Sequence, residues 1–216
     1  RRFIKLSGAA ASGFFLAGFM SSTVAGKSSD ELVSGAELNA FIRVSSDGKI
    51  TIYSSLPEMG QGVSTALPMI IAEELGARWE DVEVVAAPID EQKYGAQGAG
   101  GSTSIPRTWD QMRRMGASAR EMFISAGSLV MELPKEELLA RDSRVVHQTG
   151  QFMTFGQLAS LAAKQEVPDP DEVQFKARED YTIIGTSVSG VDNLVISTGA
   201  ALFGIDTRVP DMLYAA

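Results

Sequence analysis

The first feature of the chain is a pair of short runs in which β-favouring residues predominate. They lie on either side of Ser46-Asp47-Gly48, a turn signal that typically joins two antiparallel strands. We therefore predict a hairpin over residues 41–52. A further apolar run over residues 81–88 predicts another strand.

Between these strands, apolar side chains recur at three- and four-residue spacing from Val63 onward. This spacing places them on one face of a helix, which we predict over residues 65–76. Pro68 is tolerated only near a helix start, so Thr65 is the favoured N-cap. The order is then strand, loop, helix, strand.

A second, longer helical pattern covers residues 109–131, and Thr108 with Gln111 fits a capping box at its start. A hairpin over residues 144–155 follows, with Thr149-Gly150 at its turn. Thr154 and Gln157 are spaced to cap a short helix that ends at Lys164.

Prolines and acidic residues then interrupt the pattern, which predicts a linker over residues 167–190. The last segment, residues 191–216, contains strand-like and loop-like stretches and ends in an apolar run. We expect the chain to be the front part of something larger. The predicted fold class is α+β, with mixed sheets and packed helices.

Composition narrows the class of protein. The chain has 216 residues, 44% of them hydrophobic, which is enough for one or two domains with a real core. Its formal net charge of −8 argues against sequence-independent binding of nucleic acid, so no nucleic-acid partner is expected. The chain contains no cysteine, which excludes disulfides, thiolate metal sites and iron–sulfur ligation by the chain itself.

The N-terminal residues 1–26 have the pattern of an export signal. Arg1-Arg2 precedes an apolar stretch rich in small residues, and Thr23-Val24-Ala25 fits a small-residue cleavage site. The paired arginines resemble the twin-arginine signal, which predicts delivery to the periplasm. The alternative is an amphipathic N-terminal helix, but no polar face interrupts residues 8–20.

Two glycine-containing loops are the candidate binding sites, and each precedes a predicted helix. In the first, Gly60, Gln61 and Gly62 allow close approach of a ligand to the main chain. In the second, glycines including Gly101 lead into three hydroxyl side chains, those of Ser102, Thr103 and Ser104. Loops that open helices present N–H groups to anions, above all to phosphates. Tight turns and a serine N-cap are the structural alternatives.

The sequence gives little support for a dinucleotide-binding or nucleotide-triphosphate site, for catalytic residues or for metal ligands. Thr65 and Thr103 stand where the dinucleotide fingerprint requires its third glycine, and no Walker lysine follows either loop. His147, the only histidine, is expected at the surface of a hairpin strand, and Glu73-Glu74 are expected to be solvated. A solvated helix face is also expected for most of the arginines in the long helix or just before it: Arg107, Arg113, Arg114 and Arg120. We therefore name no catalytic residue and no metal ligand in this chain.

Three stretches, in order, resemble the molybdenum-binding large subunit of the xanthine dehydrogenase family. They are "SSDGKITIYSSLPEMGQGVSTALPMIIAEELGARWEDVEVV", "GAGGSTSIPRTWDQMRRMGASAREM" and "LFGIDTRVPDMLYA". Their order is similar to that in the family branch of the isoquinoline 1-oxidoreductase β-subunits. The resemblance implies that residues 27–166 form part of a molybdopterin-dinucleotide-binding domain. It also implies that residues 191–216 begin an α/β hammerhead domain.

The same resemblance implies an activity and a set of partners. The whole enzyme would hydroxylate an aldehyde or an N-heterocycle with water-derived oxygen, using molybdenum held by molybdopterin cytosine dinucleotide. Its catalytic glutamate would lie beyond residue 216. Partners would be the remainder of the large subunit or a second chain, an iron–sulfur small subunit and a cytochrome electron acceptor.

Within this chain, the resemblance implies that Gly60, Gln61 and Gly62 contact the pterin dinucleotide from one side and Ser102, Thr103 and Ser104 from another. Residues 1–216 alone would then be inactive. The competing class of function is an exported, non-catalytic glycine-loop module that binds a partner or a small ligand.

Overall fold

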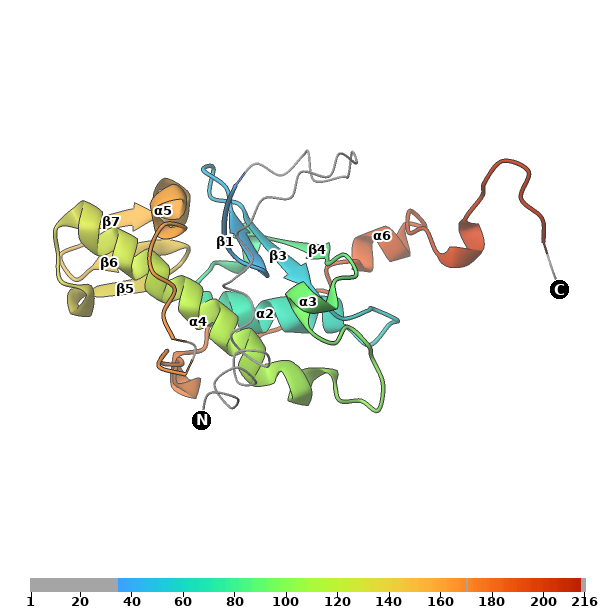
Figure 1. The fold of residues 1–216 in the computed structure, drawn as a ribbon, viewed down its shortest axis with the longest axis horizontal. Helices are drawn as coiled ribbons and strands as arrows, with labels where there is room; N and C mark the ends of the chain where they lie inside the picture. The colour runs from blue at the N-terminus through green and yellow to red at the C-terminus, as the bar shows by residue number, and fades with distance from the viewer. Residues whose placement is uncertain (1–34, 170, 215–216) are drawn as a thin grey trace. The chain divides into compact units, whose positions relative to one another are not determined.

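The computed structural model describes residues 35–169 and 171–214, so the predicted export signal over residues 1–26 lies outside the described part. The described residues divide into two compact units, 35–186 and 187–214. The first unit is α+β, as expected, and contains both sheets and the three longest helices (Figure 1).

The first sheet has four strands in the order β1-β2-β3-β4. Their bounds are β1 Ala36–Asn39, β2 Ile42–Val44, β3 Ile50–Ser54 and β4 Val82–Ala86. Strands β2 and β3 pair antiparallel across the Ser46-Asp47-Gly48 turn, which confirms the predicted hairpin. Gly48 supplies the turn with a φ of 94°.

Strand β4 pairs with β3 in parallel, and α2 (Val63–Leu75) makes the crossover between them. The predicted strand–loop–helix–strand unit is therefore confirmed, but the helix begins two residues earlier than expected. Its N-cap is Gly62, with a φ of 79°, so the prediction of Thr65 as N-cap is wrong. Pro68 is the sixth residue of the helix and is accommodated within it.

The longest described helix, α4 (Ser104–Met131), follows the short α3 (Glu91–Tyr94) and packs along α2. It begins five residues before the predicted start, with Thr103 at its N-cap. The hydroxyl of Thr108 donates to the carbonyl of Ser104 at 2.7 Å inside the helix, so the predicted capping box at Thr108 is wrong. A Cβ at Gly116 would stand 2.4 Å from the carbonyl oxygen of Ile71, and this glycine therefore allows the close approach of the two helices.

A second sheet of three antiparallel strands covers the C-terminal half of α4. Its strands are β5 (Leu138–Arg141), β6 (Arg144–His147) and β7 (Phe152–Thr154). The predicted hairpin is β6–β7, whereas β5 was not predicted. Helix α5 (Phe155–Ala162) begins with the Thr154–Gln157 capping box, which confirms that prediction.

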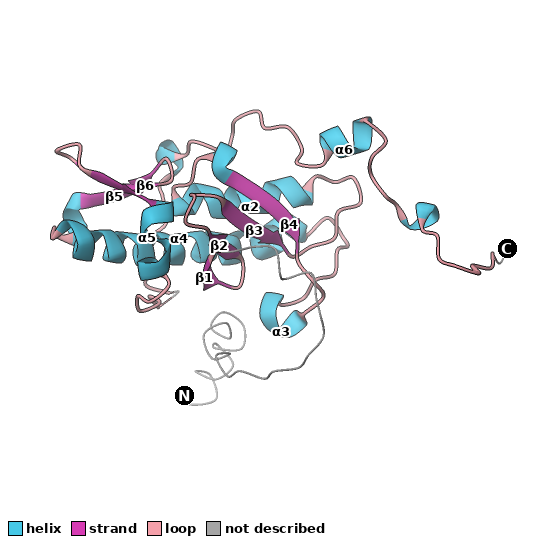
Figure 2. Ribbon diagram, turned by 90° about the horizontal axis from the view of Figure 1, so that it is seen from above, coloured by secondary structure: helices cyan, strands magenta, loops and turns pink. Residues whose placement is uncertain are grey.

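One hydrophobic core is continuous from the first sheet to the second, because α4 contacts both (Figure 2). Phe41, Phe123 and Phe155 are its largest fully buried side chains. The rings of Phe123 and Phe155 stack with their centroids 4.1 Å apart, joining α4 to α5. Short elements complete the described residues: the 3-10 turns η3 Trp79–Asp81, η4 Lys135–Glu137 and η5 Arg178–Asp180, and, in the second unit, the short helix α6 (Asn193–Ser197) and the 3-10 turn η6 Gly204–Asp206.

Two adjacent glutamates near the end of α2 hold residues 174–184, which we call the docked strap. Glu73 is fully buried, and its Oε2 accepts from the main-chain N–H groups of residues 182–184 at 2.8, 2.6 and 3.0 Å. Its Oε1 lies 3.0 Å from Nζ of Lys176. Burial works to raise the pKa of Glu73, but these N–H donors and the ammonium outweigh it and lower the pKa. The prediction that Glu73 and Glu74 are solvated is wrong.

Glu74 ties the same strap to α4 through two guanidinium groups. Arg113 Nε donates to Glu74 Oε1 at 2.6 Å, and Arg120 Nη1 donates to Oε2 at 3.1 Å. Each guanidinium also donates to a strap carbonyl, Arg113 to that of Lys176 and Arg120 to that of Gln174. The expected solvated helix face is therefore wrong for these two arginines. The docked strap, which lies within the predicted linker, is held against α2 and α4.

The second unit, residues 187–214, contains α6 and η6, and no strand is described in it. The strand-like stretches predicted for the last segment are therefore not strands within its described residues. Many of its large apolar side chains are exposed, including Leu202 at 90% and Leu213 at 93%. None of the described helices, in either unit, is long and apolar enough to cross a membrane.

Candidate functional site

The two glycine-containing loops leave the same edge of the first sheet. The parallel pair β3–β4 ends with Ser54 opposite Ala86, and residues 55–62 and 87–103 follow these two strand ends. In α/β units the carboxyl ends of parallel strands are where ligands are usually bound. Both segments therefore start at the same edge of the sheet, although about forty residues separate the two loops in sequence.

The helices that follow the loops also begin at one end of the domain. The C-cap of α2, Gly76, packs against Ala140 of β5, and the C-terminal half of α4 packs its Gly127 against Val145 of β6. Both helices therefore run toward the second sheet, and both begin on the side away from it (Figure 1). Ile71 of α2 contacts Gly116 of α4. At a rise of about 1.5 Å per residue, α2 begins roughly 12 Å before Ile71, and α4 begins roughly 18 Å before Gly116. The loops do not lie on opposite faces.

Glu58 organises the first loop and was not singled out from the sequence. Its Oε1 accepts from the N–H groups of Gly60 and Gly62 at 2.8 and 2.9 Å, and its Oε2 accepts from the N–H of Ser64 at 2.8 Å. Partial burial works to raise the pKa of Glu58, but the N–H donors lower it to about 2. The carboxylate therefore occupies the main-chain N–H groups that we expected to face an anion.

The side chain of Gln61 closes the same loop from within. Its Oε1 accepts from the N–H of Met59 at 2.7 Å, and its Nε2 donates to the carbonyl of Pro57 at 2.8 Å. An amide has two donor hydrogens and two acceptor lone pairs, so each end keeps one further hydrogen-bonding position. Gln61 is exposed, and a ligand can therefore reach those positions.

The two glycines are required by their main-chain conformation. Gly60 has a φ of 102° and Gly62 a φ of 79°, both in the region that L side chains rarely adopt. A Cβ at either position would meet no described atom within 4 Å. Both glycines therefore serve the shape of the loop, and their outer faces are open to a ligand.

The second loop differs in charge from the first. Gly101 and Ser102 both have positive φ, 61° and 56°, and Thr103 caps α4 without a side-chain bond to the helix. The first turn of α4 contains no acidic residue, whereas Arg107 lies there and donates to the carbonyl of Gly98 at 2.8 Å. This helix start is therefore electropositive, and Ser102 and Thr103 beside it are exposed, while Ser104 is half-buried.

His147 is not at this site and is not a surface residue. It is 8% exposed, with Nε2 3.0 Å from Oε2 of Glu137 and Nδ1 2.8 Å from the hydroxyl of Thr149. It belongs to the second sheet, at the other end of α2 and α4 from the glycine loops. Among the described residues, no three acidic or histidine side chains are grouped to bind a metal ion.

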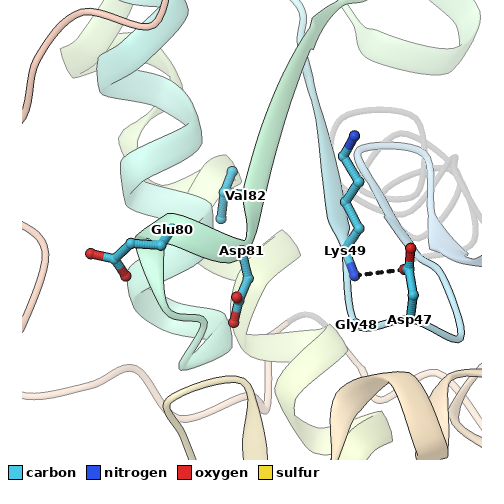
Figure 3. A pocket seen from close by; sticks show the side chains of 6 residues that line it. All are labelled: Asp47, Gly48, Lys49, Glu80, Asp81 and Val82. Atoms are coloured by element: carbon cyan, nitrogen blue, oxygen red, sulfur yellow. Dashed lines mark hydrogen bonds between the residues drawn. The ribbon is translucent and has the colours of Figure 1, made fainter.

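A hollow of about 300 Å³ lies at the opposite edge of the first sheet, where β3 and β4 begin (Figure 3). Asp47, Glu80 and Asp81 line it together with Lys49. The one ammonium pairs with Glu83 at 3.0 Å, and Asp81 pairs with an arginine, so carboxylates dominate the hollow. A phosphate group would be repelled there. None of the predicted site residues lines it.

Comparison of the sequence with known proteins assigns the chain to a family. The sequence matches the molybdopterin cofactor-binding domain over residues 7–207. It is 30% identical over 175 residues to the membrane-bound aldehyde dehydrogenase (pyrroloquinoline-quinone) of Gluconacetobacter polyoxogenes, covering 79% of this chain and 22% of that protein.

Two further relatives are components of named dehydrogenases or oxidoreductases. One of the subunits of nicotinate dehydrogenase from Pseudomonas putida is 31% identical over 179 residues, covering 82% of this chain and 15% of that protein. The β-subunit of isoquinoline 1-oxidoreductase from Brevundimonas diminuta is 29% identical over 215 residues, covering 82% and 28%. The chain thus spans less than a third of the length of these relatives. It belongs to the molybdopterin cofactor-binding domain family, which confirms the resemblance to the molybdenum-binding subunits of the xanthine dehydrogenase family.

Proposed function

We propose that this chain is the N-terminal portion of a molybdenum hydroxylase large subunit, and that its two glycine-containing loops help to hold the molybdopterin dinucleotide. The observation that carries the proposal is that both loops follow the carboxyl ends of the parallel strands β3 and β4, at the same edge of the sheet. The family match supports the class of cofactor. The role of each loop residue is our own inference.

The two loops would bind different parts of such a cofactor. Gly101, Ser102, Thr103 and Ser104 would hold the diphosphate, because the start of α4 carries positive charge and no acid in its first turn. Gly60, Gln61 and Gly62 would face the pterin, because their N–H groups already bind Glu58 and Gln61 offers a neutral amide. When bound, the cofactor would supply the molybdenum centre for hydroxylation with water-derived oxygen.

The names of the relatives support an aldehyde or an N-heterocycle as substrate. The cytosine form of the dinucleotide, an iron–sulfur small subunit and a cytochrome electron acceptor complete the proposed complex. The catalytic glutamate would lie outside residues 1–216, so these residues alone should show no turnover. Measurable turnover by them would place the catalytic group inside this chain.

One relative carries pyrroloquinoline quinone in its name, and this cofactor is the specific rival. The two proposals differ in elemental content. We expect the purified full-length complex to contain about one molybdenum per large subunit, together with a pterin released by acid. A complex that contains the quinone and no molybdenum would refute the proposal. A complex with neither would favour the non-catalytic module.

The proposed location is the periplasm, reached by the twin-arginine route. Changing Arg1 and Arg2 together to lysine keeps their charge and should leave the precursor in the cytoplasm. Fractionation of cells that express the tagged full-length protein measures this. Normal export of the double variant would point to another route or to a non-signal segment.

A further inference from the structure

The start of α2 is capped in an unusual way. Its N-cap is a glycine, which has no side chain to cap the helix, and its first turn contains no acidic residue. The anionic group that such a helix start favours comes instead from Glu58, four residues before the N-cap. Glu58 is also the only charged residue between Pro57 and Ser64.

The contacts of Glu58 extend beyond the helix. Only one of its three N–H donors, Ser64, belongs to α2, whereas Gly60 lies in the loop and Gly62 is the boundary residue. Both glycines have positive φ, a conformation that glycine also leaves easily. The carboxylate therefore fixes the conformation of the loop itself in addition to capping the helix. Gln61 braces the same turn from its other side.

From this geometry we propose that Glu58 is a positioning residue, a built-in anion that holds the Gly60-Gln61-Gly62 loop in the shape that receives the uncharged pterin. The inference rests on the proposed function of the two loops. A negative charge already lies against the first loop, so a diphosphate is repelled there and is directed to the start of α4. Glu58 thus sets the orientation in which the cofactor binds, without touching the reacting atoms.

The test compares variants of the purified full-length complex. Glu58→Ala removes the carboxylate. Removing outer-shell groups that orient metal ligands typically costs roughly 10- to 100-fold in affinity, and we take the same range for a group that orients the cofactor's loop. We expect molybdenum to be lost from this variant faster than from the wild type by about that factor. Glu136→Ala, which removes an exposed acid from η4 beside the second sheet, is the matched control and should retain molybdenum normally.

Rescue by a small anion tests whether the first loop requires an anion at the place of the Glu58 carboxylate. Formate can accept hydrogen bonds from the N–H groups that Glu58→Ala exposes. It should slow the loss of molybdenum from this variant and leave the wild type unchanged. Glu58→Gln keeps the volume and one acceptor oxygen, so it should lose molybdenum at an intermediate rate. This second variant keeps the test decisive if Glu58→Ala does not accumulate.

Two results would overturn the inference alone. One is loss of molybdenum from the Glu58 variants at the wild-type rate. The other is loss that follows a lower unfolding temperature of the cofactor-free protein and does not respond to formate. A wild-type complex without molybdenum would instead overturn the proposed function and this inference with it.

Discussion

Replacing Glu73 by glutamine should release the docked strap. The carboxylate is fully buried and accepts from three consecutive main-chain N–H groups, with Lys176 as its counter-ion. Each such bond to a charged acceptor contributes about 1.5–3 kcal/mol. The sum of these bonds overstates the stability lost in Glu73→Gln, because the strap can detach and its N–H groups can then bind water. Breaking one partner of a buried ion pair costs about 3–5 kcal/mol, and glutamine keeps one acceptor oxygen, so we expect about 3 kcal/mol.

Hydrogen exchange measures this loss where it arises. A local change of about 3 kcal/mol corresponds to exchange on the order of 100-fold faster at the amides of residues 182–184. Glu136→Gln, an exposed change of the same kind, should leave those amides unaffected. If Glu73→Gln leaves exchange at residues 182–184 unchanged, the carboxylate does not hold the strap and our account of its burial is wrong.

Three further predictions concern the helix contact, the first loop and acid. Gly116→Ala would place a Cβ 2.4 Å from the carbonyl oxygen of Ile71. We expect it to lower the free energy of unfolding, measured by urea titration, by about 1–3 kcal/mol. Gly98→Ala is the control and should leave this free energy unchanged, because no atom lies within 4 Å of its Cβ position. Gln61→Ala should weaken cofactor retention mildly, by about 0.5–1.5 kcal/mol, which dialysis followed by molybdenum analysis can measure. The pKa values of Glu58 and Glu73 both lie below the usual 4.5 of a glutamate, so both carboxylates stabilise the fold fully above pH 4.5. Their contributions decline as the pH falls, and that of Glu58 is lost as the pH passes its pKa of about 2. The loss of unfolding free energy on acidification should therefore be smaller in Glu73→Gln than in the wild type.

Periodicity and turn chemistry were sufficient for much of the fold. The hairpin around Asp47-Gly48 and the Thr154–Gln157 capping box are local features, and the structure confirms both. Helix starts were predicted less well, because sequence rules expect the N-cap side chain to cap the helix, and neither Gly62 nor Thr103 does so. The cap of α2 comes from Glu58, and α4 continues backward through Pro106 to Ser104.

The buried charges could not be predicted from local sequence. Glu73 and Glu74 are adjacent on a helix, a pattern that normally indicates solvation, and their strap partners lie about one hundred residues later. The strap itself follows a segment rich in proline and acids, which indicated a linker. For Glu58 a signal was present, since it is the one acid beside a glycine pair that opens a helix. The glycine loops themselves were found because glycine is placed where its conformation is needed.

A cryo-electron microscopy structure of the full-length complex with its cofactor tests the central claim most directly. We predict molybdopterin dinucleotide density between the two loops, with the diphosphate within hydrogen-bonding distance of Gly101–Ser104 and the pterin against Gly60, Gln61 and Gly62. Density for the cofactor at another edge of the domain, with either loop facing only solvent, would contradict the account.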